Sequence, residues 1–173
     1  MPFAVTHVLS SIILVDLYRD YIAKHKKYFT LHTIFIAGFA GLLPDIDILL
    51  NWILGVFGAE LVHRTFTHTP LFGLIFLIPA FAYLYFKKHK IAMYFFVTTF
   101  GIFVHLLLDF LIAPDYSGGI VLFYPFSKIA FDIGILGGLS TLETMQLFAA
   151  VDAIILMLWL WHEEIRHKIS DYI

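Results

Sequence analysis

The sequence contains no cysteine among its 173 residues. Disulfides, iron–sulfur clusters and thiolate zinc sites are therefore excluded. Any metal ion held by this chain must be bound through imidazole and carboxylate groups. Nine histidines are present alongside that absence, and they give the first indication of which ligands such an ion would have.

Charged residues are also scarce, at 14% of the chain, and the net charge is only -2. No basic field is available to attract nucleic acid, so we expect no nucleic-acid partner. Hydrophobic residues make up 61% of the chain, against about half in a soluble domain. Because a small globule has too much surface to bury such an excess, the composition predicts an integral membrane protein.

Five apolar stretches reach or approach the roughly 20 residues that a membrane helix needs. They are Phe3–Tyr18, Thr33–Phe57, Leu71–Phe86, Ile91–Ile112 and Leu142–Trp161. The first lacks a basic leader and a cleavage site, so we expect a retained helix. Gly41 and Pro44 interrupt the second, where a broken helix is tolerated only against protein or water. With no repeat or linker, we predict one all-α domain over residues 1–173, a polytopic bundle of about five transmembrane helices.

Lysine and arginine predict how the bundle sits in the membrane, because they concentrate in cytoplasmic loops. Basic residues follow the first, third and fifth stretches: Lys24, Lys26, Lys27, Lys87, Lys88, Lys90, Arg166 and Lys168. We therefore expect an inner-membrane protein with its N-terminus outside and its C-terminus in the cytoplasm. The sequence carries no signal for an oligomeric state.

Charged residues inside the membrane cost about 2.5–3.5 kcal/mol each on insertion scales, so each needs a reason. One group falls at a similar depth near the outer face: His7, Asp45, Asp47, His63, His68, His105, Asp109 and Asp152. The orientation came from the basic residues alone, so this shared depth is an independent observation. We predict that most of the group forms one metal site near the outer face.

The spacing of these residues suits metal binding. His105 and Asp109 are one helical turn apart and point from the same face, so both can bind one ion or one can orient the other. Asp45 and Asp47 follow Pro44, where irregular backbone can turn both toward one cavity. The spacing alone leaves open which of them is a ligand.

Other members of the group suit the chemistry around a metal. Arg64 lies one turn before His68 if that stretch is helical, and it is suited to hold a phosphate or another oxyanion. We expect Asp45 or Asp47 to act as general base, and His63 to protonate a leaving group or to orient a ligand. Asp152 fits a ligand, an acceptor behind the ligands or a hydrogen bond between helices.

Plainer interpretations exist for each residue taken alone. They are an interfacial position for His7, an inter-helix hydrogen bond for His105 with Asp109, a helix cap for Asp45, and headgroup binding for His63 and Arg64. Each needs its own coincidence, whereas one metal site accounts for the common depth of all of them. The set as a whole therefore favours the metal site.

The remaining histidines belong to the opposite, cytoplasmic edge: His25, His32, His89, His162 and His167. The stretch Trp161–His167 resembles a metal motif by spacing, but we expect it to be a solvated helix end. Asp16 lies deep in the first stretch, where we expect it to pair with Arg19 or with the backbone.

Four motifs in order resemble the LexA-regulated, membrane-bound metal-dependent hydrolase family over nearly the whole chain. They are Thr6-His7, Leu43-Pro44-Asp45-Ile46-Asp47, His63-Arg64-Thr65-Phe66-Thr67-His68 and His105-Leu106-Leu107-Leu108-Asp109. The same order is similar to the soluble, all-helical zinc-dependent phospholipase C group. That resemblance implies five metal ligands: His7, Asp45, His68, His105 and Asp109.

The phospholipase group also uses an N-terminal tryptophan and a late His-x-x-x-Glu, and neither has a suitably placed match here. We therefore expect one or two divalent ions, with zinc as first choice and manganese as second. The predicted function is hydrolysis of a phosphoester in a phospholipid or related lipid headgroup, with Asp47, His63 and Arg64 as catalytic residues. The alternatives are a metal-ion transporter or a membrane protein whose metal only staples its helices.

Overall fold

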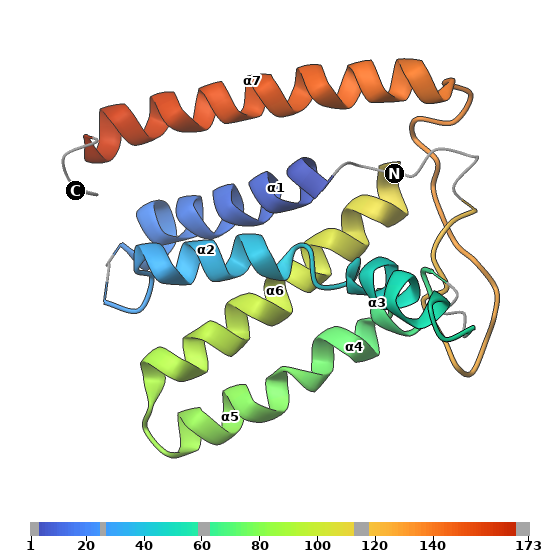
Figure 1. The fold of residues 1–173 in the computed structure, drawn as a ribbon. Coiled ribbons are helices and arrows are strands. Elements are labelled where there is room, and N and C mark those ends of the chain that lie inside the picture. Colours follow the sequence, from blue (N-terminus) through green and yellow to red (C-terminus); the bar gives the residue numbers. More distant parts are fainter. Residues whose placement is uncertain (1–3, 25–26, 59–62, 113–117, 169–173) are drawn as a thin grey trace.

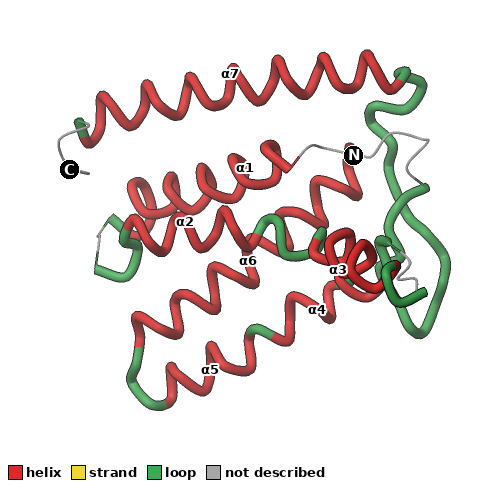
Figure 2. The backbone as a smooth tube through the Cα atoms, in the orientation of Figure 1, coloured by secondary structure: helices red, strands yellow, loops and turns green. Residues whose placement is uncertain are grey.

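The fold is that of a computed structural model, and the structure describes residues 4–24, 27–58, 63–112 and 118–168. Its elements in chain order are α1 (Ala4–Leu17), the π-helical turn η1 (Tyr18–Ala23), α2 (Leu31–Ala40), α3 (Ile46–Gly55), the 3-10 turn η2 (Phe66–His68), α4 (Pro70–Ile75), α5 (Leu77–Tyr85), α6 (His89–Ile112) and α7 (Thr141–His167). The described residues contain no strand, only an isolated bridge between Ile120 and Phe131 in the long connection before α7 (Figure 2). The predicted all-α class is confirmed.

The second apolar stretch breaks at the predicted place. Helix α2 ends at Ala40, residues 41–45 form turns, and α3 begins at Ile46. Pro44 has no N–H for a helical hydrogen bond. Gly41 permits a close approach to α1, because a Cβ added there would lie 2.8 Å from the His7 carbonyl oxygen. The predicted break is confirmed, and the structure adds that α2 meets α1 at this point.

The expectation of five membrane helices is not confirmed. Within the described ranges, only α6 and α7 are long and apolar enough to cross a membrane by length and composition. The other apolar stretches form shorter helices, because the break after Ala40 divides one and a turn at Phe76 divides another. Pro79 explains the second division, since it offers no N–H to the carbonyl of Ile75. A hydropathy count does not register such breaks.

Helix α2 lies at the centre of the bundle, between α1 and α6. The three helices bury a small apolar core that includes Ile12, Val15, Ile34 and Val97. Gly101 brings α6 against α2, where an added Cβ would lie 2.5 Å from a backbone oxygen of α2; such close contacts at small residues are common between membrane helices. Helix α5 packs on α6, and α7 lies along the outer side of α1 (Figure 1).

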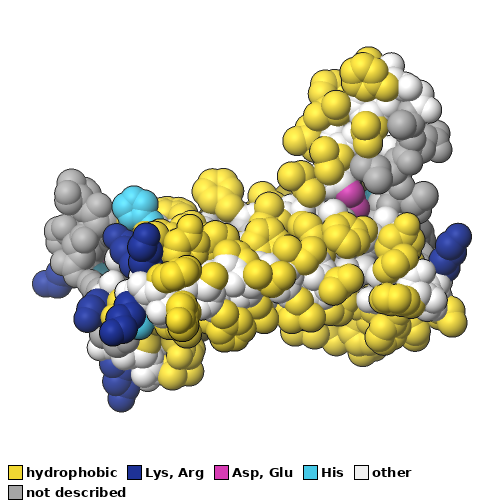
Figure 3. All heavy atoms as spheres, turned by 90° about the horizontal axis from the view of Figure 1, so that it is seen from below, with side chains coloured by type: hydrophobic (Ala, Val, Ile, Leu, Met, Phe, Trp, Pro, Cys, Tyr) yellow, Lys and Arg dark blue, Asp and Glu magenta, His cyan; other side chains and the backbone are white. Residues whose placement is uncertain are grey.

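The face shown in Figure 3 is apolar over most of its area, and its lysine and arginine side chains gather mainly at one end. The connection from α1 to α2, the turn from α5 to α6 and the end of α7 all lie at that end (Figure 1). At the other end α3 stands away from the bundle as an apolar arm. Asp47 is the one buried residue among the ten of α3, while Trp52 is 74% exposed.

Candidate metal centre

Four side-chain atoms from three parts of the chain converge beside the break in the second stretch. His105 and Asp109 come from α6, His68 from η2, and Asp45 from the turn before α3. The His68 Nε2 atom lies 3.3 Å from His105 Nε2, 3.4 Å from Asp45 Oδ1 and 3.8 Å from Asp109 Oδ2. His105 Nε2 lies 3.7 Å from each of the same two carboxylate oxygens.

These spacings match the coordination shell of a small divalent ion. A tetrahedral ion with ligand bonds of about 2.0–2.1 Å holds its ligand atoms about 3.3 Å apart. Five of the six distances among the four atoms fall between 3.3 and 3.8 Å. Asp45 Oδ1 and both carboxylate oxygens of Asp109 are buried and accept no hydrogen bond from any described residue. Buried oxygens without donors are expected where a cation takes the donors' place.

A backbone carbonyl in the break between α2 and α3 fixes the tautomer of His105. His105 Nδ1 lies 2.7 Å from the carbonyl oxygen of Gly41. Because a carbonyl only accepts, Nδ1 carries the hydrogen and the neutral ring keeps its lone pair on Nε2. That lone pair faces the other three ligand atoms, as a metal ligand requires.

Asp47 lies behind His68 rather than among the four converging atoms. Its Oδ2 accepts hydrogen bonds from the Arg64 backbone N–H (3.1 Å) and the Thr67 hydroxyl (2.9 Å), and it lies 3.4 Å from His68 Nδ1. Its Oδ1 accepts from His63 Nδ1 at 2.8 Å. With both oxygens engaged, Asp47 is placed to orient the two histidines.

The electrostatics around His68 favour positive charge. Burial lowers the pKa of His68, but the adjacent carboxylates of Asp45 and Asp47 outweigh that effect and raise the pKa above its ordinary value. The centre as a whole holds the carboxylates of Asp45, Asp47 and Asp109 against the single guanidinium of Arg64, counting described residues. With neutral histidines this leaves about two negative charges, which a divalent ion would balance.

His7 joins the centre from α1. Its ring stacks on His105 with the ring centroids 3.8 Å apart, and its Nε2 lies 3.5 Å from Asp109 Oδ1. His7, Asp45 and His105 also form a group whose ligand atoms all lie within 4.8 Å of one another. His7 thus fits either a further ligand of the same ion or a ligand of a second one.

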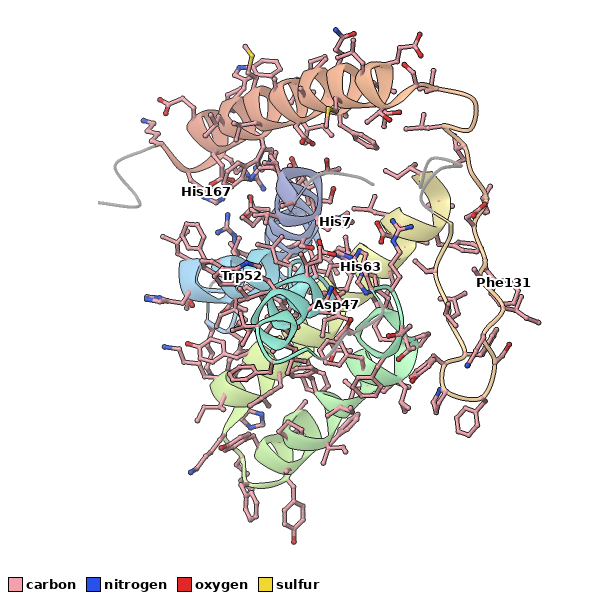
Figure 4. The ribbon with its side chains drawn as sticks, turned by 45° about the vertical axis from the view of Figure 1, so that its right-hand side comes forward. His7, Asp47, Trp52, His63, Phe131 and His167 are labelled. Atoms are coloured by element: carbon pink, nitrogen blue, oxygen red, sulfur yellow. The ribbon has the colours of Figure 1, made fainter. Side chains whose placement is uncertain are left out.

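His63 stands at the rim, where Figure 4 shows it beside Asp47 and near His7. Its side chain is 30% exposed, whereas the other histidines of the centre are buried. Because Asp47 holds Nδ1–H, the neutral ring presents Nε2 for proton transfer or ligation. Asp45, His63 and His68 also satisfy the spacing of a metal group.

Arg64 is buried against the centre. One guanidinium nitrogen lies 3.5 Å from Asp109 Oδ2, and another donates to the Gly119 carbonyl at 3.2 Å. The helical condition for a one-turn spacing between Arg64 and His68 is not met, because Arg64 has a left-handed φ of 64° and the 3-10 turn begins only at Phe66. A left-handed backbone at a non-glycine residue costs about 1–3 kcal/mol, and such residues are enriched at functional sites.

Asp152 lies outside the centre. Its Oδ2 accepts a hydrogen bond from the Thr6 hydroxyl at 3.1 Å, which links α7 to α1. Of the three roles considered for it, the hydrogen bond between helices is the one observed. Thr67 and the Gly41 carbonyl are contributors that sequence reasoning missed, since hydroxyls and backbone oxygens have no signature of their own.

The end of α7 is not the solvated helix end that was expected. Glu163 and His167 are each only 8% exposed. They face Arg19, whose guanidinium lies 2.7 Å from Asp16, 3.8 Å from Glu163 and 2.6 Å from His167. Asp16 pairs with Arg19 as predicted. Figure 4 shows His167 well apart from His7, so this ionic cluster is a separate site. His25 lies outside the described residues.

The fold and the centre together define a helical membrane protein with a buried histidine–aspartate centre suited to a divalent ion. The profile of the YdjM inner membrane protein family matches residues 1–169, so the chain belongs to that family. The membrane association predicted from composition is thereby supported. No curated protein and no solved structure matches the chain with significance.

Proposed function

We propose that this protein is a membrane-embedded, metal-dependent hydrolase that cleaves a phosphoester in a phospholipid or a related lipid headgroup. The observation that carries the proposal is the convergence of His68, His105, Asp45 and Asp109, with five interatomic distances of 3.3–3.8 Å and three buried oxygens without donors.

The donor set fits the expected ion. Two imidazole nitrogens and two carboxylate oxygens suit zinc first and manganese second. His68, His105, Asp45 and Asp109 would hold one ion, and His7 would join it or help to hold a second. When bound, a divalent ion supplies Lewis-acid polarisation of the phosphoryl group and lowers the pKa of a ligated water.

The protein's own residues handle the protons. In the hydrolysis the oxygen of water forms a new bond to phosphorus, the ester P–O bond breaks, and the departing oxygen gains a proton. His63 takes a proton from the attacking water at Nε2 and passes it to the departing oxygen, while Asp47 stabilises the charged imidazole through Nδ1. Asp47 acts as a positioning residue and not as the base that takes the proton, because both of its oxygens already accept hydrogen bonds.

Arg64 is placed to hold the phosphoryl oxygens. Its guanidinium lies 3.5 Å from Asp109 Oδ2, one of the four ligand atoms, so it borders the position where a phosphate would be bound. Guanidinium groups bind phosphate through two parallel hydrogen bonds. The surrounding low dielectric strengthens that contact.

The proposed membrane placement puts the centre near the outer headgroups. The N-terminus lies outside and the C-terminus in the cytoplasm, since basic side chains gather at the end where α7 finishes (Figure 3). In this arrangement the shorter helices pack beside α6 and α7 within a polytopic bundle. The substrate is then a component of the membrane itself.

The competing function is metal-ion transport through the same centre. The ionic cluster around Arg19 gives this reading polar groups at the opposite end of α1. Against it, the buried apolar residues Ile12 and Val15 lie between the two sites on α1, and the arginine places a fixed positive charge on the path. A third reading is a metal that only staples the helices.

One set of variants separates these readings. Purified wild type, His68→Ala, Asp109→Asn and the exposed control His32→Ala are compared for bound metal, cleavage of phosphatidylglycerol in micelles, ion flux in liposomes and thermal unfolding. We expect the two centre variants to lose metal and cleavage while His32→Ala keeps both. Loss of flux without any lipid cleavage by the wild type establishes transport, and loss of thermal stability alone establishes a staple.

A further inference from the structure

An apolar groove of about 610 Å³ runs along the outside of the bundle and ends at the metal centre. Its walls come from the end of α2, the break and the apolar arm α3, and include Phe39, Leu43, Asp45, Ile48, Leu49 and Trp52. Asp45 is the one polar residue that lines it. Figure 3 shows an acidic side chain at the base of the projecting arm, next to hydrophobic side chains.

The groove is where the centre meets the outside. The side chains of His68, His105 and Asp109 are fully buried, and His7 is 1% exposed. Asp45 is 20% exposed and is the most open of the proposed ligands. Asp45 is therefore the proposed ligand at which this groove touches the centre.

We propose that this groove binds one acyl chain of a lipid whose phosphoester reaches the centre at Asp45. The inference rests on the proposed function and adds the recognition element, a chain-binding surface formed by α2 and α3. Membership of an inner membrane family and the exposed apolar arm place the groove against acyl chains. Water-soluble phosphoesters lack the part of the molecule that this surface contacts.

A second groove in the same molecule provides the control. It has a volume of about 700 Å³ and lies between α1 and α6, with Leu14, Val97 and Phe100 among its lining residues. No residue of the metal centre lines it. A lipid bound in this second groove would be a surrounding membrane lipid and not a substrate. Leu14 and Leu49 are matched positions, because they are 46% and 54% exposed and neither supports the core.

The first experiment measures binding without hydrolysis. A phosphodiester lipid with a photoreactive diazirine in its acyl chain is added to the detergent-solubilised full-length protein, and labelled peptides are mapped by mass spectrometry. We expect labelling concentrated in residues 39–52, reduced about tenfold by Leu49→Trp and unchanged by Leu14→Trp. Labelling that spreads evenly over the apolar surface, or that Leu49→Trp leaves unchanged, overturns the proposal.

The second experiment measures cleavage against chain length. Each CH₂ bound in an apolar groove raises affinity roughly fourfold, so kcat/KM is expected to rise steeply from short-chain to long-chain phosphodiesters. Leu49→Trp should flatten that rise, and Leu14→Trp should not. Equal cleavage of all chain lengths by the wild type overturns the groove but leaves the hydrolase intact. Labelling in the groove without cleavage of any phosphoester supports the groove and overturns the hydrolase.

Discussion

The metal centre at the start of α1 and the ionic cluster at its far end are built from the same residue types, yet their charges are balanced in different ways. In the ionic cluster Arg19 lies within 2.7 to 3.8 Å of the carboxylates of Asp16, Asp20 and Glu163. In the metal centre the Arg64 guanidinium lies 3.5 Å from Asp109, while Asp45 and Asp47 face histidines.

The comparison teaches that spacing alone does not identify a metal site. Asp16, Asp20, His162 and Glu163 also have ligand atoms within 4.8 Å of one another. There the Arg19 guanidinium lies against all three carboxylates, so the cluster joins α1 to the otherwise exposed α7. In the metal centre the Arg64 guanidinium lies against Asp109, and we propose that a divalent ion supplies the positive charge beside Asp45.

The largest expected effect is loss of activity on removing a ligand of the metal centre. His105→Ala deletes the ring held by Gly41 and stacked on His7. We expect bound zinc to disappear and phosphoester cleavage to fall by at least about 10³-fold, since a metal supplies several kcal/mol of transition-state stabilisation. Elemental analysis and single-turnover assays measure the two effects. Wild-type metal content in this variant would contradict the assignment.

The next largest effect should be a loss of stability on changing the ionic cluster around Arg19. Arg19→Met leaves the buried carboxylates of Asp16 and Glu163 without their cation. We expect unfolding to become easier by about 3–5 kcal/mol, the usual result of removing one partner from a buried ion pair. Denaturation in detergent measures this, and metal content serves as the control. A loss of metal equal to that of His105→Ala would show that the two sites are not independent.

An intermediate effect on metal affinity or activity is expected for Asp47, which lies behind His68. Asp47→Asn keeps the size of the side chain but removes the charge that orients His63 and His68. We expect metal affinity or activity to fall about 10–100-fold, as for other residues that hydrogen-bond to metal ligands. Competition with a chelator measures the affinity. A loss as complete as that of His105→Ala would instead make Asp47 a direct ligand.

The smallest expected effect is a pH dependence of the contact between α7 and α1. Burial raises the pKa of Asp20, but hydrogen bonds from Arg19 and His167 outweigh this, so the pKa is lowered overall. The stabilisation is therefore fully present above the unfolded-state value of about 3.8 and is lost as the pH falls through the lower folded value.

Fluorescence of Trp159, whose indole donates to Asp16, reports on that contact during an acid titration. Asp20→Asn is expected to remove the Asp20 contribution to the acid transition. An unchanged titration would assign the transition to other groups.

The sequence predicted which histidines and aspartates lie close together better than it predicted the helices around them, and the bound metal stays a prediction. The one-turn spacing of His105 and Asp109 predicted that both point from the same helix face. The shared depth of the other histidines and aspartates predicted that the separate motifs form one site. Burial of ionisable groups in a membrane is restrictive enough for such an argument. The sequence did not resolve the helix lengths, because a proline such as Pro79 lowers hydropathy little while it divides a helix.

The part of the ionic cluster on α7 was missed for a different reason. Whether Glu163 and His167 face solvent depends on where α7 packs, and no local pattern in α7 specifies that. The available signal lay at the end of α1 and in η1, where Asp16 and Arg19 continue an apolar helix. Two charges in such a helix indicate partners on another one.

The break after α2 has a consequence for how the centre is assembled. In a continuous helix the Gly41 carbonyl would accept from the backbone N–H of Asp45, but that N–H donates instead to Leu42. The Gly41 oxygen is thereby released from the backbone ladder and given to His105. The break that shortens this helix thus supplies the hydrogen bond that orients His105. Substitutions that made residues 40–46 a continuous helix would remove that hydrogen bond.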